Sequence, residues 1–177
     1  MENKKFYRFL LKDIKKHGVL YAPKGTNIRF GEDVIPVKDW ENIVFELKGG
    51  IYLPFMNANV TANFANEDLK NLIQKIVPHD YPLEFFPINV KSEEHGDKTY
   101  YLIHFKKIFD VIDNENSVWI VDSIAKPWID YNKAKDLDFF NSSARINGII
   151  VSDKMKKLIK KNKLDAGIEF WEVPYIN

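Results

Sequence analysis

Apolar residues recur at helical spacing in two segments of the chain. Between residues 67 and 77 they occupy positions i, i+3, i+4, i+7 and i+8, which form one stripe along a helix. Asn66 suits the N-cap of this helix, and Pro78 ends it. Between residues 153 and 162 a second apolar stripe follows Ser152, which is also a favourable N-cap. The spacing therefore predicts two amphipathic helices, over residues 67–77 and 153–162.

The other apolar segments are short and rich in β-branched and aromatic residues, which is typical of strands. Residues 83–90 and 99–105 flank a polar turn and predict a hairpin. Further strands are expected at residues 42–48, 51–53 (as a partner of 42–48), 117–121, 148–151 and 168–173, with 109–112 extending the sheet. The apolar positions of residues 5–12 are compatible with either a strand or a helix. Residues 54–65 are predicted to be irregular. Residues 122–147 show no clear hydrophobic period. The pattern predicts an α+β fold, a mostly antiparallel sheet with the two helices packed on it.

The two predicted helices belong to segments that share a layout. Each segment has a polar cap, an acidic first turn, an amphipathic helix, a short turn and an aromatic strand. The first runs from Asn66 to the strand at 83–88, and the second from Ser152 to the strand at 168–173. Either the likeness is generic to helix–strand units, or one unit is used twice against a shared sheet.

Composition and charge narrow the class of protein. The chain has 177 residues, of which 45% are hydrophobic and 29% charged, which fits one soluble domain over residues 1–177. Its 26 Lys and Arg residues balance 25 Asp and Glu residues, so wholesale electrostatic binding to nucleic acid or to a membrane is not expected. There is no cysteine, no signal-peptide pattern at the N-terminus and no apolar run near the roughly 20 residues that span a bilayer. A cytoplasmic location is therefore expected.

The sequence contains no motif of known catalytic chemistry. The four histidines, His17, His79, His95 and His104, lie at no metal-ligand spacing, and no nucleophile or phosphate-loop motif is present. We therefore predict no catalytic residue, no metal site and no cofactor.

Two segments are candidates for contact with a partner. Trp128, Asp130 and Tyr131 lie together in the aperiodic stretch, and Trp and Tyr in irregular loops are favoured contact residues in protein interfaces. The alternative is that these aromatic rings fold back onto the core. The helix at 153–162 is rich in lysine, which indicates either a solvated face or a patch for an acidic partner or a phosphate backbone.

Several short motifs occur together in an order typical of one known family. They are Leu83-Glu84-Phe85-Phe86-Pro87-Ile88, Thr99-Tyr100-Tyr101-Leu102-Ile103, Asp110-Val111-Ile112-Asp113 with Ser117, and the C-terminal blocks 149–159 and 167–173. An "FxP" strand, a "YY" strand and a "D-x-x-D-x-x-x-S" turn follow one another. Over residues 43–174 the chain thus resembles a bacterial immunity-protein family that is found beside polymorphic toxin genes.

The resemblance implies a non-catalytic protein that binds and neutralises a cognate toxin protein. It carries no catalytic residue over to this sequence, because the shared motifs are caps, turns and core strands. Two other classes remain open on the sequence alone. One is a small enzyme whose site is assembled from distant residues, and the other is a nucleic-acid-binding regulator that uses the lysine-rich helix.

Overall fold

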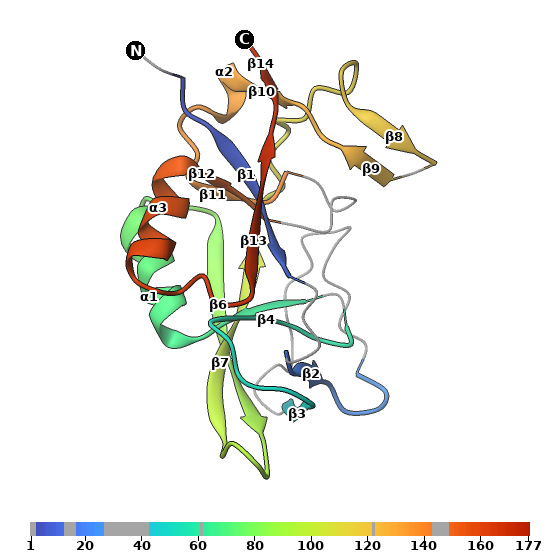
Figure 1. Cartoon of the computed structure of the whole chain (residues 1–177), viewed down its shortest axis with the longest axis vertical. Helices are drawn as coiled ribbons and strands as arrows, with labels where there is room; N and C mark the ends of the chain where they lie inside the picture. The colour runs from blue at the N-terminus through green and yellow to red at the C-terminus, as the bar shows by residue number, and fades with distance from the viewer. Residues whose placement is uncertain (1–2, 13–16, 27–42, 61, 122, 143–148) are drawn as a thin grey trace.

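The body of the molecule consists of two β-sheets with two helices beside them (Figure 1). The structure is a computed structural model, and it describes residues 3–12, 17–26, 43–60, 62–121, 123–142 and 149–177. Within these residues the fold is α+β with mostly antiparallel pairing, as the sequence predicts.

The large sheet has six strands in the order β2-β3-β6-β7-β5-β4. The strands are β2 (Val19–Tyr21), β3 (Val44–Lys48), β4 (Phe55–Asn57), β5 (Asn63–Ala65), β6 (Leu83–Lys91) and β7 (Lys98–Phe105). The predicted hairpin is confirmed, because β6 and β7 pair antiparallel from Leu83 opposite Phe105 to Val90 opposite Lys98. The pair β3–β6 is parallel, and the other neighbours in this sheet run antiparallel.

The small sheet has four antiparallel strands in the order β11-β12-β1-β13. They are β1 (Phe6–Leu11), β11 (Phe139–Phe140), β12 (Ile149–Ser152) and β13 (Ile168–Val173). Strand β1 lies in the middle, and apolar side chains on both of its faces are buried. Burial on both faces explains why its sequence shows no clean alternation and could not be told from a helix.

Arg8 is the one charged residue of β1, and it is half-buried. Its Nε atom is buried and has no hydrogen-bond partner among the described residues. Burial lowers the pKa of this guanidinium, because desolvation disfavours the charged form.

Both predicted helices are confirmed to within one residue at their C-terminal ends. They are α1 (Glu67–Ile76) and α3 (Asp153–Lys161). The side chain of Asn66 accepts a hydrogen bond from the backbone N–H of Leu69 at 2.9 Å. The hydroxyl of Ser152 accepts one from the backbone N–H of Met155 at 3.1 Å. A third helix, α2 (Tyr131–Ala134), lies in the stretch without a clear period and was not predicted.

The shared layout of the two helical segments is a repeated topological unit. In the first copy, β5 and β6 both pair antiparallel with β7, which lies between them, and α1 connects β5 to β6. In the second copy, β12 and β13 both pair antiparallel with β1, and α3 connects them. Each copy is thus a split βαβ unit, two parallel strands with one antiparallel strand inserted. The expectation of a shared sheet is wrong, because each unit contributes to a sheet of its own.

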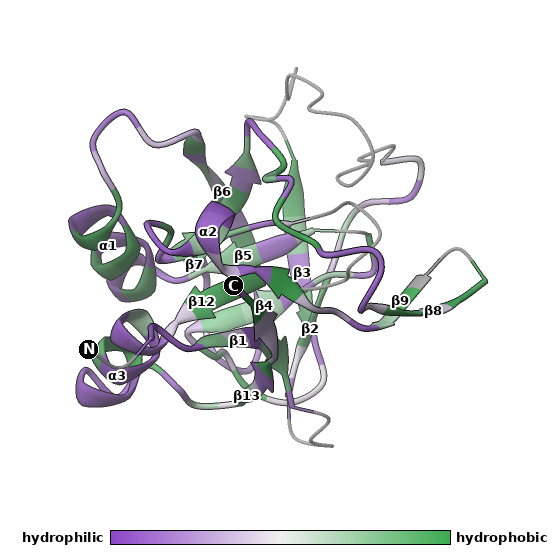
Figure 2. Cartoon of the chain, turned by 90° about the horizontal axis from the view of Figure 1, so that it is seen from above, coloured by the Kyte–Doolittle hydropathy of each residue, from purple (hydrophilic) through white to green (hydrophobic). Residues whose placement is uncertain are grey.

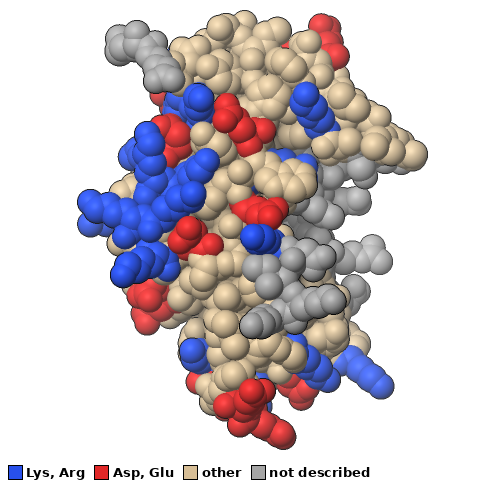
Figure 3. All heavy atoms as spheres, in the orientation of Figure 1, with Lys and Arg blue, Asp and Glu red and all other residues tan. Residues whose placement is uncertain are grey.

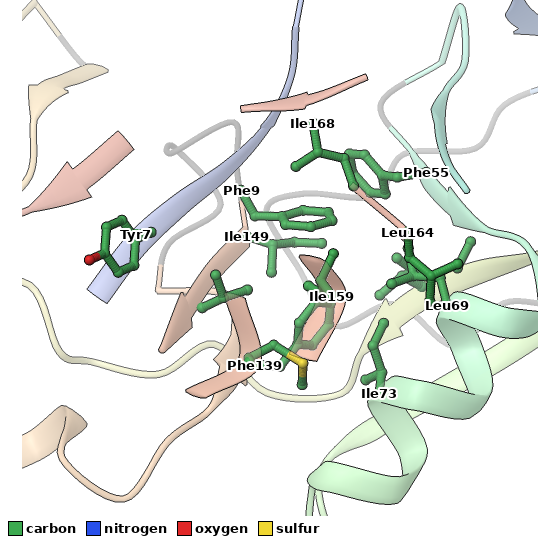
Figure 4. Packing of buried hydrophobic residues seen from close by; sticks show 14 residues of the cluster. Tyr7, Phe9, Phe55, Leu69, Ile73, Phe139, Ile149, Ile159, Leu164 and Ile168 are labelled. Carbon is green, nitrogen blue, oxygen red and sulfur yellow. The ribbon is translucent and has the colours of Figure 1, made fainter. Parts of the chain in front are cut away.

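The two units meet through their helices and a common hydrophobic core. Helices α1 and α3 lie side by side (Figures 1 and 2). Leu69 and Ile73 of α1 and Ile159 of α3 point into a cluster that also contains Phe9 of β1 and Phe55 of β4 (Figure 4). A second cluster covers the other face of the large sheet, and a third lies on the far face of the small sheet under α2. The small sheet and the large sheet therefore share one core.

Other details of the strand prediction are wrong. Residues 51–53 do not pair with β3, since Ile51 makes only an isolated bridge with His17, and the neighbours of β3 are β2 and β6. The irregular stretch 54–65 contains β4 and β5, whose three residues each are too short for a periodic signal. Residues 109–112 do not extend the sheet, because only Ile112 makes a bridge, with Ile129. Of the predicted segments, residues 42, 61, 122 and 143–148 lie outside the described residues.

Candidate protein-binding surface

A β-hairpin projects from the body on the side away from α1 and α3 (Figures 1 and 2). It is formed by β8 (Val118–Ile120) and β9 (Ser123–Lys126), which pair antiparallel as a separate two-stranded sheet. The register shifts between Val118 and Trp119, so that Val118 lies opposite Lys126 and Trp119 opposite Ile124. The predicted strand at 117–121 is therefore confirmed, but it belongs to neither main sheet.

Strand β8 and the residue that follows it are apolar and exposed. Val118, Trp119, Ile120 and Val121 expose 49%, 39%, 63% and 91% of their surfaces. The other large exposed apolar residues of the described chain are not adjacent in sequence, whereas these four are consecutive; the others are Val19 and Tyr21 of β2, Ile51, Trp171 and Ile176. The exposed apolar residues therefore form one continuous run along β8 and the residue that follows it. Contiguous patches of this kind mark interaction sites on soluble proteins.

The base of the hairpin is held by the turn that precedes it. The backbone N–H of Asn116 donates to Asp113 Oδ1 at 2.8 Å, and this hydrogen bond lowers the pKa of Asp113. The hydroxyl of Ser117 donates to the carbonyl of Asp113 and accepts from the backbone N–H of Trp128 at 2.9 Å. Ile112 and Ile124 are buried against each other below the hairpin. The "D-x-x-D-x-x-x-S" motif of the sequence thus has a structural role, which is to anchor the hairpin.

Of the three predicted contact residues, Trp128 lies at this base. Its backbone also accepts a hydrogen bond from the N–H of Asp113 at 2.9 Å. Its ring is half-buried, and Lys126 Nζ lies 6.0 Å from the ring centroid. Trp128 therefore follows β9 closely in sequence and is hydrogen-bonded to Ser117, the residue before the exposed apolar strand β8.

Asp130 and Tyr131 make contacts within the molecule. The carboxylate of Asp130 caps α2 and accepts hydrogen bonds from the backbone N–H groups of Asn132 and Lys133 at 3.0 and 3.4 Å. The ring of Tyr131 lies 5.1 Å from that of Tyr175, and its hydroxyl accepts a hydrogen bond from the backbone N–H of Lys4 at 3.2 Å. A role of Trp128, Asp130 and Tyr131 in partner binding stays a prediction.

The sequence analysis missed the apolar residues of the hairpin. Val118, Trp119, Ile120 and Val121 were assigned to an ordinary strand of the sheet. An unbroken apolar run is typical of a strand buried on both faces, so the pattern alone does not identify these residues as exposed.

The lysines of α3 largely interact with neighbouring side chains. Lys154 lies 2.9 Å from Asp138, and Lys157 lies 3.1 Å from Asp153. Lys156 Nζ lies 3.4 Å from the centroid of the Tyr7 ring. Figure 3 shows lysines gathered on the side of α3 with acidic side chains beside them. These contacts favour the interpretation of this helix as a solvated face.

The described residues provide no evident centre for catalysis. No group of three potential metal ligands occurs among them. The groove between α1 and α3 is lined by Asp68, Lys75 and Lys161 among others, and a second groove near β1 and β4 is lined by apolar residues and three asparagines. His104, whose pKa is lowered mainly by burial, lies within β7 and outside these grooves.

No helix within the described residues is long and apolar enough to cross a membrane.

Comparison with known proteins defines the class of this molecule as an immunity protein. The family model described as "Immunity protein family (Imm11)" matches residues 56–174, which include the first repeated unit from β5 to β7, the second unit without its strand β1, and the projecting hairpin. The chain belongs to the Imm11 immunity protein family. None of the curated proteins matches the chain in sequence. Membership in this family implies a toxin as the partner in general, and immunity proteins are generally non-catalytic.

Proposed function

We propose that this protein is the immunity component of a bacterial polymorphic toxin system and neutralises one cognate toxin by binding to it, without catalysis and without a cofactor. The family match over residues 56–174 is the observation that carries this proposal. The exposed apolar hairpin supports it, because a protein that acts by binding needs such a surface. The cysteine-free sequence suits the cytosol as the place of action.

The test uses the product of the adjacent toxin gene. Co-expression is expected to rescue cells from its toxicity, and the two chains are expected to elute together from a size-exclusion column. Residual toxin activity is then titrated against this protein. A binding mechanism predicts that inhibition is complete at one equivalent of protein and incomplete below it.

Two results would contradict the proposal. If a small fraction of an equivalent inactivates all of the toxin, the protein acts as an enzyme on it. If no complex forms and toxicity is unchanged, the protein is not the immunity partner of that toxin. A matched control is the same titration with a toxin of a different family, which is expected to stay active.

A further inference from the structure

The small sheet has an open edge along β13. This strand is the last in the order β11-β12-β1-β13, and it pairs along its whole length with β1 on its inner side (Figure 1). It has six residues, whereas β11 at the opposite edge of the same sheet has two. An edge strand of this length presents a row of backbone groups with which a further strand can pair.

The hydrogen-bond pattern fixes which backbone groups of β13 point outwards. The N–H of Lys12 donates to the carbonyl of Gly167 at 2.8 Å, so these residues form a hydrogen-bonded pair of the antiparallel ladder. Such pairs alternate with pairs whose N–H and C=O groups point away from the partner strand. The register between β1 and β13 is unbroken over its six pairs. The N–H and C=O groups of Phe170 and Glu172 therefore point to the open edge.

The same edge already carries a strand just beyond β13. The carbonyl of Pro174, two residues after Glu172, accepts a hydrogen bond from the N–H of Ile129 at 3.0 Å. Here β14 (Tyr175–Ile176) pairs in parallel with β10 (Ile129–Asp130). The chain that precedes β10 leads away into the β8–β9 hairpin (Figures 1 and 2). Within the described residues, the N–H groups of Phe170 and Glu172 donate to no acceptor.

The side chains of β13 favour a partner other than a second copy of this chain. Glu172 is exposed, and Glu169 accepts a hydrogen bond from the indole N–H of Trp171 at 2.9 Å. Charged residues on an edge strand are a usual protection against pairing between identical copies. Trp171 is 56% exposed, and tryptophan is among the residues that most often dominate the binding energy of protein interfaces.

We propose that an extended segment of the toxin adds to β13 as the fifth strand of the small sheet, pairing with the backbone of Phe170 and Glu172 and covering Trp171. This inference rests on the proposed function. Strand addition takes its affinity from main-chain hydrogen bonds, and the side chains beside them supply the specificity.

Amide hydrogen exchange, followed by NMR, tests the proposal on the unmodified protein. In the free protein the amide protons of Phe170 and Glu172 are expected to exchange fast, because they face the open edge. Those of Glu169, Trp171 and Val173 pair with β1 and are expected to exchange slowly. Addition of the toxin is expected to slow exchange at Phe170 and Glu172 by about tenfold or more. If the complex forms and neither amide is slowed, the toxin binds elsewhere and the inference is wrong.

A pair of substitutions separates the backbone from the side chain. Glu172→Pro removes the outward N–H and leaves the ladder with β1 in place, since an edge strand tolerates proline where the N–H faces solvent. Glu172→Ala removes the same carboxylate but keeps the N–H, so it is the matched control. The Kd of the toxin complex is measured by calorimetry after thermal unfolding has shown that both variants are folded. We expect Glu172→Pro to weaken binding by about tenfold or more and Glu172→Ala by less than about threefold.

Two further results would overturn the inference while the immunity function stands. Equal weakening by the two variants would assign the contact to the carboxylate side chain. A dimer of the free protein in which Phe170 and Glu172 are already protected would make a second copy the occupant. If Glu172→Pro does not fold, the exchange measurement decides by itself. If the unmodified protein neither binds the toxin nor protects cells, the proposed function itself has failed and the inference fails with it.

Discussion

Asp138 connects three segments that are far apart in the sequence. Its carboxylate accepts a hydrogen bond from the Ser152 hydroxyl at 2.6 Å and lies 2.9 Å from both Lys4 and Lys154. Burial alone would raise the pKa of Asp138, but the hydrogen bonds from Ser152 and the two ammonium groups outweigh it. The net pKa of Asp138 is therefore lowered in the folded protein.

A lowered pKa makes the contribution of Asp138 dependent on pH. Its carboxylate stabilises the fold above the ordinary aspartate pKa, and this contribution is lost as the pH falls through the lowered value. Asp138→Asn is expected to reduce the free energy of unfolding by about 2 kcal/mol at neutral pH. The difference from the unmodified protein should shrink towards zero in acid.

Urea unfolding at a series of pH values measures this difference. Asp110→Asn is the matched control, because Asp110 pairs with Lys133 on the surface and is not expected to change stability measurably. A loss that is the same at every pH would show that the carboxylate charge is not what stabilises the fold.

At the scale of elements, the two split βαβ units differ in how their helices begin. Asn66 caps α1 by accepting one hydrogen bond from the backbone N–H of Leu69, and it is half-buried. Ser152 caps α3, is fully buried and also donates to Asp138. The two caps therefore occupy equivalent positions that differ in burial.

This difference predicts that the caps are not interchangeable. Asn66→Ser is expected to be nearly neutral, because both residues are good N-caps. Ser152→Asn is expected to lower the free energy of unfolding by about 2 kcal/mol, because the larger side chain overfills a buried site. Chemical denaturation of both variants checks the prediction, and equal effects of the two exchanges would contradict it.

Elements defined by local contacts were predictable from the sequence. The stripes of α1 and α3 and the β6–β7 hairpin depend on residues that are close along the chain. The place of β1 between β12 and β13 was not predictable, because its neighbours come from the other end of the sequence. The short strand β4 carries too few residues for a period to show.

The candidate surface was likewise only partly predictable from the sequence. The run from Val118 to Val121 reads as a buried strand, because exposure is decided by what the rest of the chain leaves uncovered. Trp128 was selected by residue type and its irregular surroundings, and it does lie beside this run. Asp130 and Tyr131 were selected on the same grounds, and their observed contacts are with α2, β1 and β14 (Tyr175–Ile176).

At the scale of the whole molecule, the family match and the folded unit differ in extent. The match begins at residue 56, whereas β1 (Phe6–Leu11) is the strand that joins β12 to β13. Phe6 and Phe9 of β1 are almost fully buried, in clusters on opposite faces of the small sheet. We propose that residues 1–177 form one domain that includes this N-terminal strand.

Removal of residues 1–12 is expected to abolish the cooperative unfolding transition. The deletion separates β12 from β13 and opens the core that the two sheets share. Far-UV circular dichroism and tryptophan fluorescence measure the transition, and they are expected to coincide in the intact protein. Removal of residues 175–177, which form part of a two-residue edge pair, is the control and should leave the transition in place. A cooperative transition without residues 1–12 would show that the matched region is a domain by itself.

The position of β1 also has a consequence during translation. Its two neighbours, β12 and β13, begin at Ile149 and Ile168, so they are synthesised roughly 7 to 30 seconds after β1 at ~5–20 residues per second. Throughout this interval the segment FYRFLL has two unpaired edges, and segments of this composition tend to associate with other nascent chains. A positive charge inside such a segment opposes self-association. Arg8, whose Nε has no hydrogen-bond partner among the described residues, places such a charge in the middle of this segment.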